Sequence, residues 1–169
     1  MKIRFEFDPE KCSACGACAI ACMDQNDVDV SAGQRPYRRV YQLERGAERV
    51  YLSVACLHCA DAPCVAACPM GCIYQDAATG LTRYDTQNCV GCHACARACP
   101  YDAPTFRPTG EKRPREKMEK CQGCLPRIEA GLAPACVRAC PTGALTWRWA
   151  EEGTASPTAA LYQAWRDLI

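Results

Sequence analysis

The sequence predicts an α+β fold made of two similar halves, with short helices and β-hairpins. Three observations predict it: cysteines fall into four groups of four, the segments around these groups repeat, and large apolar side chains are scarce. Leu, Ile, Val and Phe together number only 25 of 169 residues, a scarcity typical of disordered chains. Disorder also favours high net charge, whereas this chain carries +1. Its 17 cysteines instead indicate a core built around bound metal.

Sixteen of the 17 cysteines form four groups, each closed by a three-residue gap. In chain order the groups are Cys12, Cys15, Cys18 and Cys22; Cys56, Cys59, Cys64 and Cys68; Cys89, Cys92, Cys95 and Cys99; and Cys121, Cys124, Cys136 and Cys140. Two-residue gaps let a tight loop wrap three thiolates around one cluster, and the last cysteine follows one helical turn later. The spacing therefore predicts that these sixteen cysteines bind four 4Fe–4S clusters.

Two other uses of cysteine fit this pattern less well. A secreted disulfide scaffold suits the cysteine content, but the odd count and the repeated triplets fit disulfide pairing badly. Structural zinc sites use paired C-x2-C knuckles rather than triplets.

The N-terminus shows no apolar signal region, and no apolar stretch approaches the ~20 residues that span a bilayer. The sequence thus predicts no membrane span and, by default, a cytoplasmic location, unless a partner exports the chain or holds it at a membrane.

The charge distribution argues against nucleic-acid binding. When sixteen thiolates and four oxidised cluster cores are counted, the net charge falls from +1 to about −7. The basic residues form two short runs without the aromatic side chains that stack on bases, a pattern typical of solvated faces or partner contacts. These runs are Arg35, Arg38 and Arg39, and then Lys112, Arg113 and Arg115.

Three further residues near the cysteine groups need an interpretation. Cys72 is the seventeenth cysteine and stands where Ala103 and Ala144 follow the third and fourth groups. It is predicted to be a small buried residue in place of alanine, with a redox or alternative-ligand role left open. His58 and His93 lie between ligands, but each cluster already has four thiols, so we predict that they lie beside the ligands or on the surface.

The sequence around the cysteine groups repeats. Residues 5–12 align with residues 82–89, because in both a strand-like alternation leads to an Asp four residues before the first cysteine. After the second and fourth groups, residues 68–73 and 140–145 share the pattern Cys-Pro-x-Gly. The repeats predict two ferredoxin-like halves.

Between the groups the sequence predicts short, local elements. Two pairs of segments around glycine turns predict β-hairpins, namely residues 39–43 with 50–54 and residues 73–75 with 81–84. Residues 101–117 are rich in proline and charge and predict a surface loop. Residues 125–135 fill the long gap of the fourth group and predict a short helix that ends near Gly131.

The last twenty residues predict a tail with a short helix. Ser156 is a suitable cap and Pro157 a suitable first residue, while Leu161, Trp165 and Leu168 recur on one face. This helix either packs on its own domain or docks on a partner subunit. The sequence therefore predicts one four-cluster domain over residues 1–149 and a tail over residues 150–169.

The order of the four spacings resembles the iron–sulfur subunits of the dimethyl sulfoxide reductase superfamily over about residues 3–147. Three phrases add to the resemblance: YRRVY at 37–41, YLSVAC at 51–56 and KCQGC at 120–124. It implies interlocked ferredoxin-like halves, one formed by groups 12–22 and 121–140 and the other by groups 56–68 and 89–99, each exchanging its last cysteines. The implied ligand sets are Cys12, Cys15, Cys18 and Cys140; Cys121, Cys124, Cys136 and Cys22; Cys56, Cys59, Cys64 and Cys99; and Cys89, Cys92, Cys95 and Cys68.

The same resemblance implies a non-catalytic electron-transfer subunit that links a molybdenum or tungsten pterin catalytic subunit to another redox partner. Two alternatives stay open. Iron–sulfur subunits of hydrogenases and of hydrogenase–formate dehydrogenase complexes have nearly the same cysteine layout, and a free polyferredoxin-like carrier needs no fixed partner. Met23 departs from the pattern, because proline follows the last cysteine of each of the other three groups. No catalytic triad or phosphate-binding glycine loop is present in the sequence, so no catalytic residue is predicted.

Overall fold

The computed structural model describes residues 1–108, 116–151, 153 and 156–168. Within them the strands form four two-stranded antiparallel sheets. The pairs are β1 (Lys2–Phe7) with β8 (Leu145–Ala150), β2 (Arg39–Arg45) with β3 (Glu48–Val54), β4 (Ile73–Gln75) with β5 (Thr82–Tyr84), and β6 (Thr105–Pro108) with β7 (Glu116–Glu119). The helices are α1 (Ala17–Gln25), α2 (Pro63–Ala66), α3 (Ala94–Ala98), α4 (Leu125–Glu129), α5 (Ala135–Arg138) and α6 (Pro157–Ala164), with 3-10 turns η1 (Pro9–Lys11) and η2 (Arg166–Leu168).

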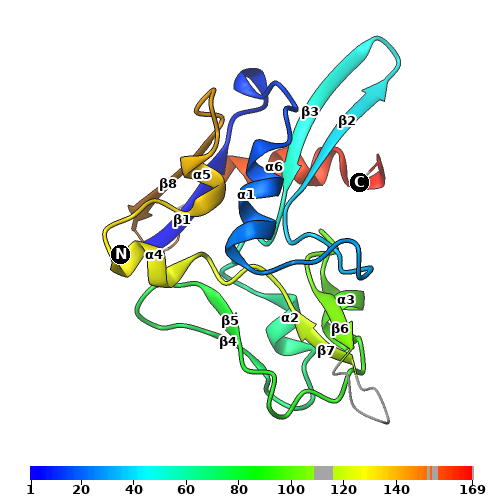
Figure 1. Ribbon diagram of the computed structural model, residues 1–169, viewed down its shortest axis with the longest axis vertical. Helices are drawn as coiled ribbons and strands as arrows, with labels where there is room; N and C mark the ends of the chain where they lie inside the picture. The colour runs from blue at the N-terminus through cyan, green and yellow to red at the C-terminus, as the bar shows by residue number, and fades with distance from the viewer. Residues whose placement is uncertain (109–115, 152, 154–155, 169) are drawn as a thin grey trace.

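The sequence repeat corresponds to a repeated strand pairing. β1 precedes the first cysteine group and pairs with β8 after the fourth; β5 precedes the third group and pairs with β4 after the second. Asp8 and Asp85 are also equivalent, because each carboxylate accepts a hydrogen bond from the amide two residues later. Figure 1 shows β1, β8, α1 and α5 together in one part of the molecule and α2, α3, β4 and β5 in the other. Helix α1 packs on α5, and α2 packs on α3.

Cysteines take part in the apolar core. The largest buried cluster combines Leu52, Val54 and Leu145 with Cys18 and Cys136. A second cluster combines Cys64 and Cys95 with Ile73 and Met118. Because so few large aliphatic residues are available, the protein buries them around its cysteine sites rather than in one separate core.

The predicted hairpins are confirmed. The first is longer than predicted: β2 and β3 pair over their full lengths, up to Arg45 and Glu48 at the turn, and the hairpin projects from the body in Figure 1. Gly46 lies at this turn with φ +62°, in the left-handed region that favours glycine. The predicted helix of the fourth group is present as α4, and Gly131 follows it with φ +74°.

The prediction of a surface loop over residues 101–117 is wrong in part. Strand β6 lies inside this range and pairs with β7, so that Phe106 faces Met118. Met118 is almost completely buried against the Cys64 and Cys95 cluster, which holds the pair together. Proline and charge are typical of loops, but Pro108 takes the last place of a strand at a sheet edge, where its missing N–H is tolerated. Residues 109–115, including Lys112, Arg113 and Arg115, lie outside the described residues.

The C-terminal helix packs on its own domain. Trp165 and Leu161 of the predicted face pack against the core, but Leu168 does not, and Thr158 and Tyr162 are buried in addition. Thr158, Tyr162 and Trp165 are the buried residues of this segment, whereas Leu168 is 42% exposed. Polar groups explain the difference: the amide of Phe7 donates to Thr158 Oγ1 at 2.9 Å, and the Tyr162 hydroxyl donates to the carbonyl of Ser53. Ser156 does precede the helix and Pro157 begins it, although the structure gives the Ser156 side chain no capping hydrogen bond. No helix in the described part of the chain is long and apolar enough to cross a bilayer.

Tyr162→Phe should cost about 1 kcal/mol of unfolding free energy, because it removes one buried hydrogen bond while Arg38 still donates to the same Ser53 carbonyl. Tyr162→Ala should cost about 3–5 kcal/mol, since it also leaves a cavity. Anaerobic urea unfolding of the cluster-loaded chain measures both. Tyr74→Phe is the control, because Tyr74 is 42% exposed. Equal midpoints for Tyr162→Phe and Tyr74→Phe would show that the hydroxyl does not hold α6.

Candidate metal centres

Three cavities are each lined by four of the predicted ligands. The cysteines that line them are Cys12, Cys15, Cys18 and Cys140; Cys56, Cys59, Cys64 and Cys99; and Cys68, Cys89, Cys92 and Cys95, the last together with Cys72. In each cavity the fourth cysteine comes from a different group than the other three. We name each predicted ligand set after the first cysteine of the group that supplies three of its members: the Cys12, Cys56, Cys89 and Cys121 sets.

The Cys121 set consists of Cys121, Cys124, Cys136 and Cys22. It lies where α1, which carries Cys22, packs on α5, which carries Cys136. Burial raises the pKa of Cys22 to about 12; the nearby Arg38 charge opposes this shift, and the thiolates of Cys136 and Cys124 add to it. Burial likewise raises the pKa of Cys121, with a further contribution from Cys22. The four sulfurs therefore share one environment.

Left-handed backbone at single residues gives the ligand loops their shape. Gly16 (φ +78°) precedes α1 and His93 (φ +60°) precedes α3. Each lies immediately after the second cysteine of its group and turns the chain, so that the third cysteine falls in the first turn of the helix. Cys18 and Cys95 reach their cavities in this way.

Backbone amides donate hydrogen bonds to sulfurs of predicted ligands in all four sets. The contacts are Ala14 to Cys12 (3.4 Å), Ala103 to Cys99 (3.4 Å), Cys72 to Cys68 (3.3 Å), Met118 to Cys89 (3.5 Å) and Gly123 to Cys121 (3.3 Å). Such bonds stabilise thiolates and tune the reduction potential of a bound cluster.

Burial makes several of the predicted ligand thiols less acidic, so a bound metal would have to displace their protons. Burial raises the pKa of Cys59 and of Cys95 to about 11, so these thiols keep their protons at neutral pH unless a metal takes the proton's place. Cys68 and Cys140 differ: burial raises their pKa, but backbone amides in the Cys-Pro-x-Gly turn outweigh it and the net shift is downward. With four sulfurs around each cavity, the residues fit an iron–sulfur cube, which would supply one-electron redox chemistry.

The seventeenth cysteine occupies the place predicted for it. Cys72, Ala103 and Ala144 are all buried, and the amides of Cys72 and Ala103 donate to the equivalent sulfurs of Cys68 and Cys99. Burial raises the pKa of Cys72 to about 11, with Cys68 adding to the shift. Cys72 therefore shares with Ala103 and Ala144 a small, buried side chain.

The two histidines behave differently from one another. His58 is 2% exposed, and its Nδ1 accepts a hydrogen bond from the Thr82 amide at 3.1 Å. Burial lowers the pKa of His58 well below its usual value, with Lys120 adding to the shift, so the ring is neutral. His93 lies on the surface, stacked on Phe106 and 2.9 Å from Glu116.

Sequence reasoning missed two buried cations beside the ligands. Arg38 belongs to a run predicted to be a solvated face or a partner contact, but it is 5% exposed and donates to the Ser53 hydroxyl, 3.2 Å from Cys18 Sγ. This prediction is wrong for Arg38. Lys120 is 1% exposed, and its Nζ lies 3.7 Å from Cys56 Sγ. The one sequence feature that could have pointed to Lys120 is its position directly before Cys121.

Comparison with known proteins gives the family. A 4Fe-4S dicluster domain model matches residues 47–148, and a 4Fe-4S binding domain model matches residues 5–22. The B subunit of the anaerobic dimethyl sulfoxide reductase of Haemophilus influenzae is 35% identical over 154 residues, which cover 83% of this sequence and 71% of the relative. The protein belongs to the iron–sulfur subunits of the dimethyl sulfoxide reductase superfamily.

Two further relatives agree with this family. The formate dehydrogenase iron–sulfur subunit of Wolinella succinogenes is 34% identical, over 85% of this sequence and 80% of the relative. The thiosulfate reductase electron transfer subunit of Salmonella typhi is 36% identical, over 82% of this sequence and 71% of the relative. The predictions of 4Fe–4S cofactors and of an electron-transfer function are confirmed, and the grouped cysteines fit four clusters. The family also decides against a disulfide scaffold and against structural zinc.

Proposed function

We propose that this iron–sulfur subunit relays electrons between a catalytic subunit with a molybdenum or tungsten pterin cofactor and another redox partner. The four clusters would be held by the Cys12, Cys121, Cys56 and Cys89 sets, in this order. Residues 1–149 would form one domain of two interlocked halves and residues 150–169 its tail. The observation that carries the proposal is the succession of contacts between neighbouring sets.

Contacts through the protein support each step of this row. Cys18 and Cys136 share one buried cluster, which joins the Cys12 and Cys121 sets. Lys120 joins the Cys121 and Cys56 sets, because its Nζ contacts both Cys56 Sγ and the carbonyl of Cys121. Cys64 and Cys95 share a second buried cluster, which joins the Cys56 and Cys89 sets.

The two ends of the row reach the surface. Cys15 and Cys92, in the two outer sets, are exposed, whereas Cys22, Cys64 and the other ligands of the inner sets are buried or half-buried. An electron can therefore enter at one outer site and leave at the other. The protein's own contribution is to fix the four thiolate sites near one another, limit the solvent contact of the inner two and donate amide hydrogen bonds to the sulfurs.

The relatives support the proposal that the partner is a catalytic subunit of this kind. They include subunits of dimethyl sulfoxide reductase, formate dehydrogenase and thiosulfate reductase. Elemental analysis of the native complex, captured anaerobically through this subunit, tests the proposal. We expect abundant iron together with molybdenum or tungsten. Nickel would indicate a hydrogenase subunit instead, and a protein that runs alone with iron as its only metal would indicate a free carrier.

A further inference from the structure

Lys120 is a buried cation at the junction of two cluster sites. Its Nζ donates to the carbonyl of Thr82, to the carbonyl of Cys121 at 3.0 Å and toward Cys56 Sγ at 3.7 Å. An ammonium has three donors and no acceptor, and these three contacts use all of them. The side chain is 1% exposed, so water contributes little to its solvation.

Arg38 holds the corresponding place at the next junction. Its Nη1 donates to the carbonyl and to the hydroxyl of Ser53, at 2.9 and 3.0 Å, and that hydroxyl lies 3.2 Å from Cys18 Sγ. Burial lowers the pKa of Arg38, but the negative charges of the neighbouring thiolates, Cys136 foremost, outweigh it and the net shift is upward. Arg38 therefore lies between the Cys12 and Cys121 sets.

Among the described residues, the polar contacts of Lys120 and Arg38 include no carboxylate. The buried Nε of Arg38 has no hydrogen-bond partner there either. Burying an unpaired charge is strongly unfavourable, so a counter-charge is needed. The anionic thiolates of the neighbouring ligand sets are the negative groups next to both cations.

A buried cation beside a cluster site affects the reduction potential of the cluster bound there. A bound 4Fe–4S cluster gains one negative charge on one-electron reduction, and burial disfavours that charge, which lowers the reduction potential. A nearby cation in low dielectric favours the reduced form and raises the potential. Each outer site has one exposed cysteine, Cys15 or Cys92. Lys120 lies between the two inner sites, and Arg38 lies between the Cys121 set and the outer Cys12 set.

We propose that Lys120 raises the reduction potentials of both inner clusters, on the Cys121 and Cys56 sets, and that Arg38 raises that of the Cys121 cluster together with that of the outer Cys12 cluster, so that the inner clusters can still accept electrons. The proposal rests on the proposed order of the four sites. In this proposal neither residue binds a cluster. Each one acts through its positive charge on the potential of a nearby cluster.

The test is an anaerobic redox titration, with dithionite as the electron source, followed by electron paramagnetic resonance on the purified native complex. Lys120→Gln keeps a hydrogen-bond donor and loses the charge, whereas Lys120→Arg keeps the charge. We expect Lys120→Gln to shift the midpoint of at least one inner cluster to more negative potential and Lys120→Arg to restore most of the shift. Arg38→Gln and Arg38→Lys form the same pair at the other junction.

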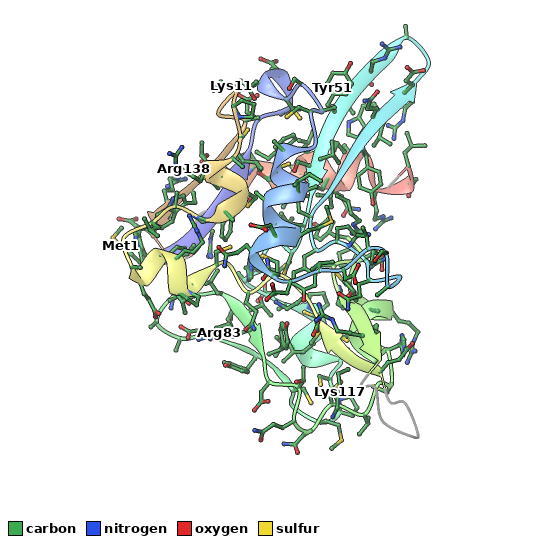
Figure 2. The ribbon with its side chains drawn as sticks, viewed as in Figure 1. Met1, Lys11, Tyr51, Arg83, Lys117 and Arg138 are labelled. Carbon is green, nitrogen blue, oxygen red and sulfur yellow. The ribbon has the colours of Figure 1, made fainter. Side chains whose placement is uncertain are left out.

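Lys11→Gln is the matched control. Lys11 directly precedes Cys12, as Lys120 precedes Cys121, but its side chain is 61% exposed and pairs with Asp8 at 3.1 Å. Figure 2 shows Lys11 at the periphery of the molecule. Because solvent screens its charge, we expect its loss to leave every midpoint unchanged.

Two results would overturn the inference. One is full iron content with unshifted midpoints in Lys120→Gln and Arg38→Gln. The other is loss of a cluster in both the charge-removing and the charge-keeping variant at each position, which would make the two residues structural. Failure of the proposed function is distinguishable, because the native complex would then lack molybdenum and tungsten, whereas the midpoint shifts of these variants do not depend on which metal the partner holds.

Discussion

Cys22→Ala is expected to remove the cluster of the fourth cysteine group and to leave that of the first group in place. Cys22 belongs to the first group in sequence, but it is buried beside Cys136 and Cys124, where α1 packs on α5. Cys140 takes its place in the cavity of Cys12, Cys15 and Cys18. Iron analysis of the anaerobically purified protein should show the loss of about a quarter of the iron, one cluster of four.

Spectral comparison identifies the cluster that is lost. If the sets are crossed, the spectrum of Cys22→Ala should match that of Cys124→Ala and differ from that of Cys15→Ala. Cys72→Ala is the control, because Cys72 is the cysteine outside the four groups and should leave all the iron in place. A Cys22→Ala spectrum that matches Cys15→Ala would refute the crossed assignment.

Gly91→Ala should strongly destabilise the Cys89 site. Gly91 lies between Cys89 and Cys92 with φ +67°, and an added Cβ would lie 2.6 Å from the backbone oxygen of Glu116, at the start of β7. A backbone atom cannot rotate away as a side chain can. The left-handed conformation costs about 1–2 kcal/mol for alanine, and the clash adds about 1–3 kcal/mol.

A second glycine distinguishes the cost of the left-handed backbone from the cost of the steric clash. Gly143 has φ +66°, but an added Cβ there meets nothing within 4 Å. Gly143→Ala should therefore pay only for the backbone conformation. The midpoint of thermal unfolding and the iron retained after mild heating should both fall further in Gly91→Ala. Equal losses in the two variants would show that β7 moves away without cost.

The local features of this protein follow from its sequence. The gaps within each cysteine group decide which sulfurs reach one loop, and the two glycine turns decide the hairpins, because both depend on residues only a few positions apart. The 4Fe–4S chemistry was predictable for the same reason. The strand of residues 105–108 was not, since its pairing with β7 depends on the burial of Met118 against the Cys64 and Cys95 cluster.

Only the tertiary structure decided which distant segments meet. It pairs β1 with β8 from opposite ends of the sequence, and it turns Tyr162 rather than Leu168 toward the core. It also buries Arg38 and Lys120, which the sequence presents as ordinary basic residues. The physical reason is that cysteine spacing is a short-range property, whereas the burial of a charge depends on every segment that packs around it.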